Sequence, residues 1–380
     1  MNLLENKKIA IVGGGPGGLT LARLLQMNGA DVKVYERDAH RHARTQGATL
    51  DLHEESGLNA LNKAGLLDAF WENYRPGADK LRIVDKNAAI AYDDSADKEN
   101  EPVRPEIDRG PLQNILLDSL KPNTVIWDSQ LLSLTKKDNV WKLDFKNDTS
   151  AMADLVIAAD GANSKIRPYI TPIKPFFTGI TIVEGAVYNS EIKSPAVHKL
   201  LNGGKIFAMD DEKTLIVSSK GDGSLVFYTG NKTYENWARD CGIDFSDKTQ
   251  VLAWFKSEFV GWNNIWDELF ENASSDFIPR PQYCMPFDQT WKTLPNLTIL
   301  GDAAHLMPPY AGEGVNMAML DALELSQCLL SSDFPDLHSA IASYEKLMLV
   351  RSSETAKKTL ESTEALHTTS AIEWLISVIS

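Results

Sequence analysis

The sequence has few cysteines and no long apolar run, and each shortage excludes a class of protein. Its three cysteines, Cys241, Cys284 and Cys328, are odd in number and far apart, so they form neither a disulfide framework nor a CxxC metal site. We therefore expect no metal and a reducing, cytoplasmic location. No stretch reaches the roughly 18 consecutive apolar residues of a membrane-spanning helix. The apolar run near the N-terminus, KIAIV, is long enough for a strand but not for a signal peptide.

Basic residues are also in short supply. The 380 residues include 52 acidic and 38 basic side chains, which gives a formal net charge of −14. A surface of that sign repels phosphate backbones and anionic lipids, so we expect neither nucleic acid nor a membrane as a partner. The hydrophobic content of 43% is ordinary for a globular protein of one large or two average domains. We expect a monomer that acts on a small molecule.

The N-terminal region has the pattern of a βαβ unit. KIAIV (8–12) is typical of a buried strand, LTLARLLQMNGA has helical spacing of its leucines and ends at Gly29, and DVKVYER (31–37) is a second strand. A strand, a glycine turn, a helix and a strand within about thirty residues predict a parallel sheet. Further strands are expected within 124–134, 140–147 and 153–160.

The middle and the end of the chain have different patterns. Between about 175 and 290, short β-rich segments alternate with Gly, Asn and Asp turns, which predicts an inserted antiparallel sheet. Residues 317–370 are expected to be helical, and the apolar tail around Trp374 is expected to pack near the junction of the two parts. We therefore predict a discontinuous α/β part (1–75, 105–170 and 290–320), a sheet part (76–104 and 175–290) and bridging C-terminal helices (337–380).

The turn between the first strand and the first helix is GGGPGG, which contains a GxGxxG pattern at Gly13, Gly15 and Gly18. Glycines in this position let the chain turn tightly and let the backbone approach a pyrophosphate, while the helix N-terminus attracts its charge. Glu36 ends the second strand, where an acid binds ribose hydroxyls. The pattern predicts a dinucleotide site, and the alternative is a tight structural turn.

DGANSKIR (160–167) directly follows the apolar strand LVIAA. Taken alone, it is equally well explained as a turn at the end of a strand. In that interpretation Ser164 is an ordinary helix cap and Arg167 is a solvated charge.

The stretch GDAAHLMPPYAGEGVN (301–316) is small, apolar and rich in glycine. Asp302 follows the apolar strand LTILG, so it lies at the carboxyl end of a strand, where α/β sheets bind ligands. Gly312 and Gly314 precede a helix expected to start near Asn316, whose N-terminus would face an electron-rich group. His305 has no second ligand at metal spacing, so we interpret it as a packing or hydrogen-bonding residue.

These motifs, in this order, resemble the FAD-dependent aromatic hydroxylase-type (class A) flavin monooxygenases over nearly the whole chain. Within that group the sequence is most similar to the tetracycline-inactivating enzymes, through VYERD (34–38), ATLDLH (48–53), KAGLL (63–67), PEIDR (105–109) and TVIWD (124–128) as well as residues 301–316. The resemblance implies an α/β (α+β overall) fold in which a Rossmann-type FAD-binding domain carries an inserted antiparallel-sheet substrate domain and C-terminal helices.

The resemblance also implies the cofactors and their contacts. FAD would be bound, and NADPH or NADH would visit as a transient reductant and contact Arg44. The residues expected to bind the cofactors are Gly13, Gly15, Pro16, Gly18, Glu36, Arg37, Arg44, Asp51, Arg109, Asp160, Asp302, Pro309, Gly312, Gly314, Val315 and Asn316. Arg44 and Arg109 also have simpler explanations, as a solvated charge and as a cap of the helix beginning at Pro111.

The implied reaction inserts one oxygen atom from O2 into an electron-rich enol or phenol carbon, through a flavin C4a-hydroperoxide. Because the cofactor carries this chemistry, no catalytic side chain is expected. The inactivation of tetracycline is the best guess, and another aromatic or polyketide substrate is the alternative. The expected substrate contacts are Glu184, Lys205, Phe207, Val226, Phe227 and Pro308.

Several features depart from the family pattern. Glu313 stands where the family usually has Gln and adds a negative charge near the flavin. In the middle sheet Val226 cannot hydrogen-bond, and Glu184 and Lys205 could pair with each other instead of binding a substrate.

Three rival functions can be separated. A flavin-dependent halogenase would carry a WxWxIP segment, and Trp262–Trp266 has the wrong spacing. A non-catalytic flavin- or drug-binding protein would not consume NAD(P)H. A simple NAD(P)H oxidase would release peroxide whether or not a substrate is present.

Overall fold

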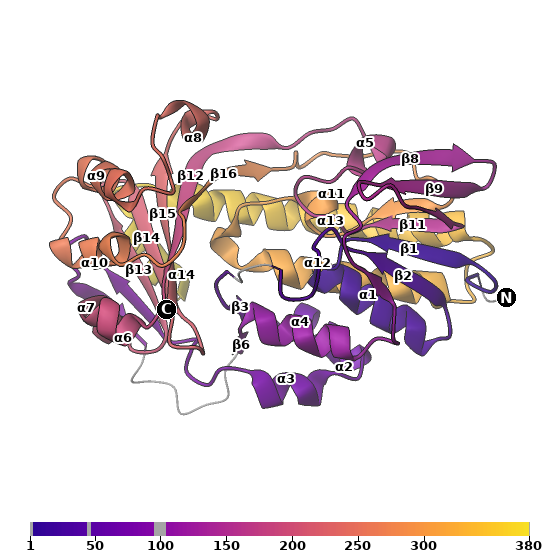
Figure 1. Ribbon diagram of the computed structural model, residues 1–380, viewed down its shortest axis with the longest axis horizontal. Helices are drawn as coiled ribbons and strands as arrows, with labels where there is room; N and C mark the ends of the chain where they lie inside the picture. Colours follow the sequence, from indigo (N-terminus) through magenta and orange to yellow (C-terminus); the bar gives the residue numbers. More distant parts are fainter. Residues whose placement is uncertain (1–2, 44–46, 95–103, 380) are drawn as a thin grey trace.

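A parallel sheet and a larger, mostly antiparallel sheet lie at opposite ends of the molecule in the computed structural model, which describes residues 3–43, 47–94 and 104–379 (Figure 1). The N-terminus lies beside the parallel sheet and the C-terminus beside the larger one. No helix within the described ranges is long and apolar enough to cross a membrane.

The five-stranded parallel sheet has the order β17-β11-β1-β2-β7. Its strands are β1 (Lys8–Val12), β2 (Asp31–Tyr35), β7 (Val125–Ile126), β11 (Leu155–Ala158) and β17 (Leu297–Ile299). The central strands β1 and β11 are apolar and almost wholly buried, as expected for a sheet covered on both faces. The predicted βαβ unit is confirmed. The predicted strand at 124–134 is two strands, because Asp128 adopts a left-handed conformation (φ 54°) between them.

Two small sheets and several helices complete this end of the molecule. The three-stranded sheet consists of β10 (Ser150–Ala153), β9 (Val140–Phe145) and β8 (Leu131–Lys137), and β3 (Leu50–Asp51) pairs with β6 (Glu106–Ile107). The helical segments here are α1 (Pro16–Met27), η1 (Glu54–Leu58), α2 (Asn59–Lys63), α3 (Leu67–Asn73), α4 (Arg109–Asp118), α5 (Arg167–Ile170), α11 (Asp302–His305), η3 (Pro309–Ala311) and α12 (Glu313–Leu330).

The larger sheet has seven strands in the order β16-β12-β15-β14-β13-β4-β5. They are β4 (Leu81–Val84), β5 (Ile90–Asp93), β12 (Phe176–Val187), β13 (Lys205–Asp210), β14 (Lys213–Ser219), β15 (Leu225–Lys232) and β16 (Ile278–Cys284). All neighbouring pairs are antiparallel except β13 with β4. The mixed α/β fold with an antiparallel region is therefore confirmed.

The two faces of the seven-stranded sheet have different neighbours. The outer face packs against α7 (Pro195–Leu201), α9 (Lys248–Glu258) and α10 (Asp267–Glu271) in one apolar core, which also contains Trp266 of η2 (Asn264–Trp266). Helices α6 (Ser190–Lys193) and α8 (Trp237–Asp240) lie at the same end of the molecule (Figure 1). The opposite face is called the inner face below. Part of it packs against the C-terminal helix α14 (Ala371–Ile379), where Trp374, Phe207 and Tyr310 surround a small core that includes Met209.

One long helix, α13 (Leu337–Ala365), extends from the parallel sheet to the larger one (Figure 1). Near its start, Ile341 and Tyr344 are buried in the core around the parallel sheet. Leu366, directly after its end, packs with Ile83 and Met209 of the larger sheet. A single rigid element therefore contacts both ends of the molecule.

Candidate cofactor and substrate site

Two glycines of the GxGxxG pattern, Gly13 in the turn before α1 and Gly18 in the first turn of α1, are required by the fold itself. Gly13 has a φ of 112°, and a Cβ there would lie 2.1 Å from the carbonyl oxygen of Ala159. A Cβ on Gly18 would lie 2.2 Å from the carbonyl oxygen of Gly13. Both clashes are with backbone atoms that cannot move aside, so the close packing of turn, helix and sheet accounts for these glycines.

Gly15 and Gly314 are different, because nothing in the described chain accounts for them. Gly15 has an ordinary φ of −76°, and a Cβ there would meet no atom within 4 Å. A Cβ on Gly314 would approach only Oδ1 of Asp302, at 3.9 Å. Gly15 immediately precedes α1, with Pro16 as its first residue, and Gly314 lies in the first turn of α12. Open space at two helix N-termini is what the binding of an anionic ligand requires.

Glu36 follows β2 and closes one side of the glycine turn. Its Oε2 accepts a hydrogen bond of 2.6 Å from the amide of Gly14, and its Oε1 accepts one of 3.0 Å from the amide of Asp38. The next residue, Arg37, is exposed. The predicted ribose-binding acid therefore lies beside the predicted pyrophosphate turn.

The DG segment after β11 contacts the loop that follows β17. Arg167 is only 7% exposed, and its guanidinium donates hydrogen bonds to the carbonyl oxygens of Ala303 (2.6 Å), Asp302 (2.9 Å) and Ala162 (3.0 Å). The interpretation of Arg167 as a solvated charge is therefore wrong. The interpretation of Ser164 as the helix cap is also wrong, because Ile166 is the N-cap of α5; the Ser164 hydroxyl instead accepts the amides of Ile166 (3.1 Å) and Arg167 (2.9 Å) in the turn before the helix.

Asp160 lies against the glycine turn, with its Cα 3.0 Å from a Cβ built on Gly13. Its Oδ2 accepts the amide of Lys165 at 2.7 Å. Its Oδ1 is buried without a hydrogen-bond partner among the described residues. Burial raises the pKa of this carboxyl above its usual value, so a ligand that donates a hydrogen bond here would satisfy an unpaired acceptor.

The loop after β17 is held by a buried ionic network. Oδ2 of Asp321, which is fully buried, accepts the amide of Gly301 (2.8 Å) and Nε2 of His305 (2.6 Å). Oδ1 of Asp321 accepts a bond of 2.6 Å from Arg351 on α13. The interpretation of His305 as a hydrogen-bonding residue is confirmed. Half-buried Asp302 projects from this loop, and burial raises the pKa of its carboxyl.

The helix α12 begins at Glu313, earlier than the predicted start near Asn316. Asn316 is fully buried. Its Oδ1 accepts hydrogen bonds from the amide of His53 and the hydroxyl of Ser56, and its Nδ2 donates to the carbonyl oxygens of Asp51 and Gly312. These bonds occupy both its donors and both acceptor positions. The prediction that Asn316 contacts the cofactor is therefore wrong; it fixes residues 51–56 against α12.

Charged side chains gather at the N-terminus of α12. Oδ2 of Asp51 lies 3.2 Å from Nε2 of His53 and 3.7 Å from Arg104. Burial alone would raise the pKa of Asp51, but the His53 hydrogen bond and the nearby cations outweigh it and lower the pKa. On the other side of the imidazole, Glu313 lies 3.7 Å from Nδ1, and burial raises its pKa. His53 and Arg104 were not predicted, because no local motif marks them.

The segment 47–49 joins α4 to the inner face of the larger sheet. Nε of Arg109 donates to the carbonyl oxygen of Ala48 at 3.0 Å, and the Tyr228 hydroxyl accepts the amide of Ala48 at 3.0 Å. Burial raises the pKa of Tyr228 to about 12. Arg109 is the first residue of α4 and Asp108 is its N-cap, so Arg109 does not cap this helix. Arg44 lies outside the described residues.

The remaining predicted loop positions lie close together. Gly312 has a φ of 71°, and a Cβ there would be 3.0 Å from Oδ1 of Asp51. Val315 is half-buried in the first turn of α12, Pro308 is buried, and Pro309 is exposed at the start of η3.

The predicted substrate residues on the sheet divide between its two faces. The strand register places Lys205, Phe207, Val226 and Glu184 on the inner face with Tyr228. Phe227 faces the other way and is fully buried against Phe270 and Phe277. The prediction that Phe227 contacts substrate is therefore wrong.

Glu184 and Lys205 do not pair with each other. Glu184 accepts a bond of 2.6 Å from Arg280, and Lys205 forms an ion pair with buried Glu106 of β6. The alternative of a Glu184–Lys205 pair is thus wrong, and the Lys205–Glu106 pair links the sheet to β6.

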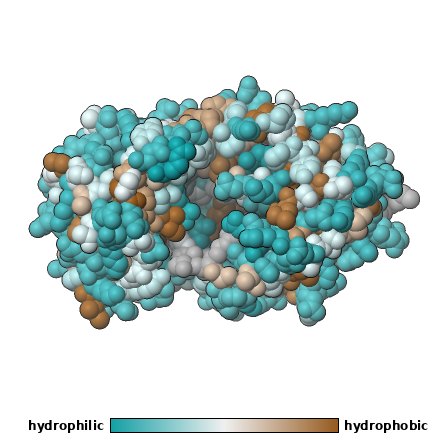
Figure 2. All heavy atoms as spheres, turned by 45° about the horizontal axis from the view of Figure 1, so that its top comes forward, coloured by the Kyte–Doolittle hydropathy of each residue, from teal (hydrophilic) through white to brown (hydrophobic). Residues whose placement is uncertain are grey.

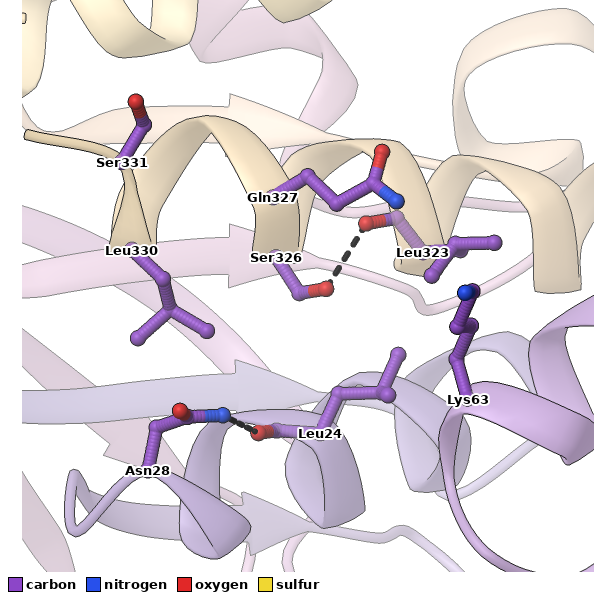
Figure 3. Close-up of a pocket in the computed structure, with 8 residues that line it drawn as sticks. All are labelled: Leu24, Asn28, Lys63, Leu323, Ser326, Gln327, Leu330 and Ser331. Atoms are coloured by element: carbon purple, nitrogen blue, oxygen red, sulfur yellow. Dashed lines mark hydrogen bonds between the residues drawn. The ribbon is translucent and has the colours of Figure 1, made fainter. Parts of the chain in front are cut away.

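The surface is hollowed between the two ends of the molecule (Figure 2). A second recess, between the C-terminal parts of α1 and α12, is unrelated to the residues above (Figure 3). Leu24 and Asn28 line it on one side and Ser326 and Leu330 on the other. Helix C-termini present carbonyl oxygens, so this recess is unsuited to a pyrophosphate.

Comparison with known proteins agrees with this geometry. Residues 6–332 match the family described as the FAD binding domain. A monooxygenase of Emericella nidulans, asqM, is 28% identical, with 93% of this chain and 94% of that protein covered. The 3-amino-4-hydroxybenzoate 2-monooxygenase PtmB3 of Streptomyces platensis is 27% identical, with 95% and 88% covered. The tetracycline destructase Tet(51) shares the fold, with a TM-score of 0.74 at 19% identity over 98% of this chain and 94% of that one. The chain belongs to the FAD binding domain family and is an FAD-dependent class A flavin monooxygenase.

Proposed function

We propose that this enzyme consumes NAD(P)H and inserts one oxygen atom from O2 into an electron-rich enol or phenol carbon, with tetracycline as the first candidate substrate. The observation that carries the proposal is the open space at Gly15 and Gly314, at two helix N-termini. The inner face of the sheet adjoins this side of the molecule, because the Tyr228 hydroxyl accepts the amide of Ala48. A cofactor and a substrate can then share one hollow.

The residues around the two glycines suit FAD. Glu36 would accept hydrogen bonds from ribose hydroxyls, the first turn of α1 would bind the pyrophosphate, and Asp302 with the first turn of α12 would hold the rest of the cofactor. When bound, FAD supplies the electron transfer and the activation of O2. The chain contributes binding, orientation and the exclusion of water, for which buried Pro308 and the aromatic Phe207 and Tyr310 are suited.

NADPH or NADH is proposed as a reductant that binds transiently. No second GxGxxG follows a strand in the sequence, so we infer no separate domain for the nicotinamide. Arg44 is proposed as its contact. A cytoplasmic monomer, and the division into a cofactor domain, a sheet domain and bridging helices, are part of the same proposal.

The inner face favours a polycyclic substrate with oxygen atoms at its edge. Phe207 offers partly exposed apolar surface on β13, and the Glu184–Arg280 and Lys205–Glu106 pairs add charged groups on the same face. Tetracycline fits this description, and its β-diketone enol contains an electron-rich carbon that the proposed reaction can oxygenate. A smaller phenolic acid is the second candidate, because Lys205 can bind an anionic oxygen.

The experiment compares NAD(P)H consumption by the FAD-loaded enzyme with and without tetracycline or a hydroxybenzoate. Lys205→Ala and Glu184→Ala should change the Kd of the accepted compound while leaving bound FAD unchanged. Lys213→Ala is the matched control, because Lys213 adjoins Thr214 on β14 but pairs with Glu258 of α9 on the outer face. If both variants keep wild-type kinetics, the substrate does not bind on the inner face and the proposed position of the site is wrong.

A further inference from the structure

A notch in the larger sheet receives the hydroxyl group of Tyr310. A Cβ on Gly230 would lie 2.4 Å from the Tyr310 hydroxyl oxygen, 2.4 Å from Oγ1 of Thr214 and 2.8 Å from Nε2 of His367. Gly230 does not have a positive φ, so the backbone conformation does not demand glycine here. The space is taken by side chains from three other elements.

The hydrogen-bond partners at the notch determine its polarity. His367 is fully buried, and burial lowers its pKa, so its ring is neutral near pH 7. Its Nδ1 lies 2.7 Å from the carbonyl oxygen of Thr363, which can only accept, so the proton is on Nδ1. Nε2 is then the acceptor for the Tyr310 hydroxyl at 3.4 Å. Burial raises the pKa of Tyr310, which keeps that hydroxyl protonated.

The notch joins parts of the molecule with different roles. Tyr310 belongs to the loop between Asp302 and Gly314, Thr214 and Gly230 lie on the inner face of the sheet, and His367 follows α13. One face of α13 contacts α12 and the loop at four-residue spacing. Arg351 binds Asp321, and the hydroxyls of Thr355 and Thr359 lie 3.7 Å from the sulfurs of Met317 and Met307.

We propose that Tyr310 is a positioning residue whose hydroxyl holds the cofactor loop in the notch between His367, after α13, and Gly230 on the substrate-bearing face of the sheet. The inference rests on the proposed function, because it assumes that the substrate lies on the inner face. Without this contact the loop retains its attachment through Asp321 but separates from the sheet. The reacting carbon would then be poorly placed, and the two electrons supplied by NAD(P)H, with two protons, would reduce O2 to hydrogen peroxide without forming an oxygenated product.

Tyr310→Phe removes the hydroxyl and keeps the ring. Hydrogen exchange of the holoenzyme without substrate should show amides of residues 306–316 exchanging about fivefold faster, the change expected for one ordinary hydrogen bond. In turnover with tetracycline or a hydroxybenzoate, the ratio of peroxide released to NAD(P)H consumed should rise, while the Kd of FAD stays within about twofold of wild type. Tyr283→Phe is the matched control, because Tyr283 lies on the edge strand β16 and its hydroxyl is 3.3 Å from Glu235.

Gly230→Ala tests the same contact from the sheet side, since it keeps the hydroxyl but fills the notch. It should reproduce both effects. Unchanged exchange in Tyr310→Phe would overturn the proposal, and so would faster exchange with an unchanged peroxide ratio, which would make the contact merely structural. If wild type oxygenates neither compound, the proposed function fails separately, and the exchange rates still decide whether Tyr310 holds the loop.

Discussion

Nε of Arg167 donates a hydrogen bond of 2.6 Å to the main-chain carbonyl oxygen of Ala303, across 136 residues of sequence. The DG segment and the loop after β17 are thereby one unit, with Asp160 beside Gly13 and Asp302 facing Gly314. Because Arg167 is buried, its loss leaves carbonyl oxygens without partners in a region where water is scarce.

We predict that Arg167→Ala lowers FAD affinity at least tenfold and lowers the thermal stability of the apoprotein. Unpaired buried acceptors cost about 1–3 kcal/mol each, and the loop that carries Asp302 loses its support. Fluorescence titration with FAD and thermal unfolding measure the two effects. Lys165→Ala, an exposed position in the same segment, should change neither.

The glycine turn allows folding and cofactor binding to be separated. Gly15→Ala should leave the unfolding free energy of the apoprotein nearly unchanged, because the new Cβ meets no atom, and should weaken FAD binding by blocking its approach. Gly18→Ala should destabilise the apoprotein, because its Cβ would lie 2.2 Å from a backbone oxygen. If Gly15→Ala binds FAD like wild type, the pyrophosphate does not lie where we propose.

The Asp302 carboxylate should strengthen FAD binding but lower the free energy of unfolding of the apoprotein. Its pKa is raised in the folded state, so the folded protein disfavours the ionised carboxylate at pH values above the unfolded pKa of about 3.9. Asp302→Asn should therefore make the apoprotein more resistant to urea near neutral pH and bind FAD more weakly. At about pH 3, where both states bind the proton, the stability difference should disappear. A less stable apoprotein near neutral pH would contradict this assignment.

The buried Asp321 network should give a pH-dependent contribution to stability. The pKa of Asp321 is lowered, so its contribution is present above about pH 3.9 and is lost as the pH falls. The pKa of His305 is raised, so its contribution is present below about pH 6.5 and is lost as the pH rises through the raised value.

Asp321→Asn should accordingly destabilise the protein by about 3–5 kcal/mol, the usual result of breaking a buried ion pair. The loss should be largest between about pH 4 and 6.5 and should fall as the pH rises through the raised pKa of His305, because the bonds to Arg351 and to the Gly301 amide then remain. Urea unfolding across this range measures it. Glu324→Gln, at the more exposed partner of Arg351, should have a smaller effect, and a pH-independent difference for Asp321→Asn would exclude a role for His305.

Local patterns were sufficient to predict the cofactor side of the molecule. The strand–glycine–helix–strand unit, the acid at Glu36 and the loop carrying Asp302 are each encoded within a few tens of residues, and the structure brings them together. The start of α12 differed because Gly312 takes a left-handed conformation and acts as the N-cap. Both Glu313 and Asn316 are acceptable first residues of a helix, so the residue pattern alone could not decide where α12 begins.

The sheet side was predicted less well, for two physical reasons. Glu184 and Lys205 find their partners through the pairing of β12 with β16 and the contact of β13 with β6, and such long-range contacts leave no local signal. The second error, which assigned both Val226 and Phe227 to the substrate site, could have been avoided from the sequence. Val226 and Phe227 are consecutive strand residues, and alternation places them on opposite faces, so only one could contact a substrate on the inner face.

The central claim is that one oxygen atom from O2 enters an enol or phenol carbon of the substrate. Purified, FAD-loaded enzyme should be incubated with NADPH, tetracycline and isotopically heavy dioxygen, in parallel with a hydroxybenzoate, and the products should be analysed by mass spectrometry. We predict a product that has gained one heavy oxygen atom, formed in proportion to the NADPH consumed. Consumption of NADPH that yields peroxide alone, with both compounds recovered unchanged, would contradict the account.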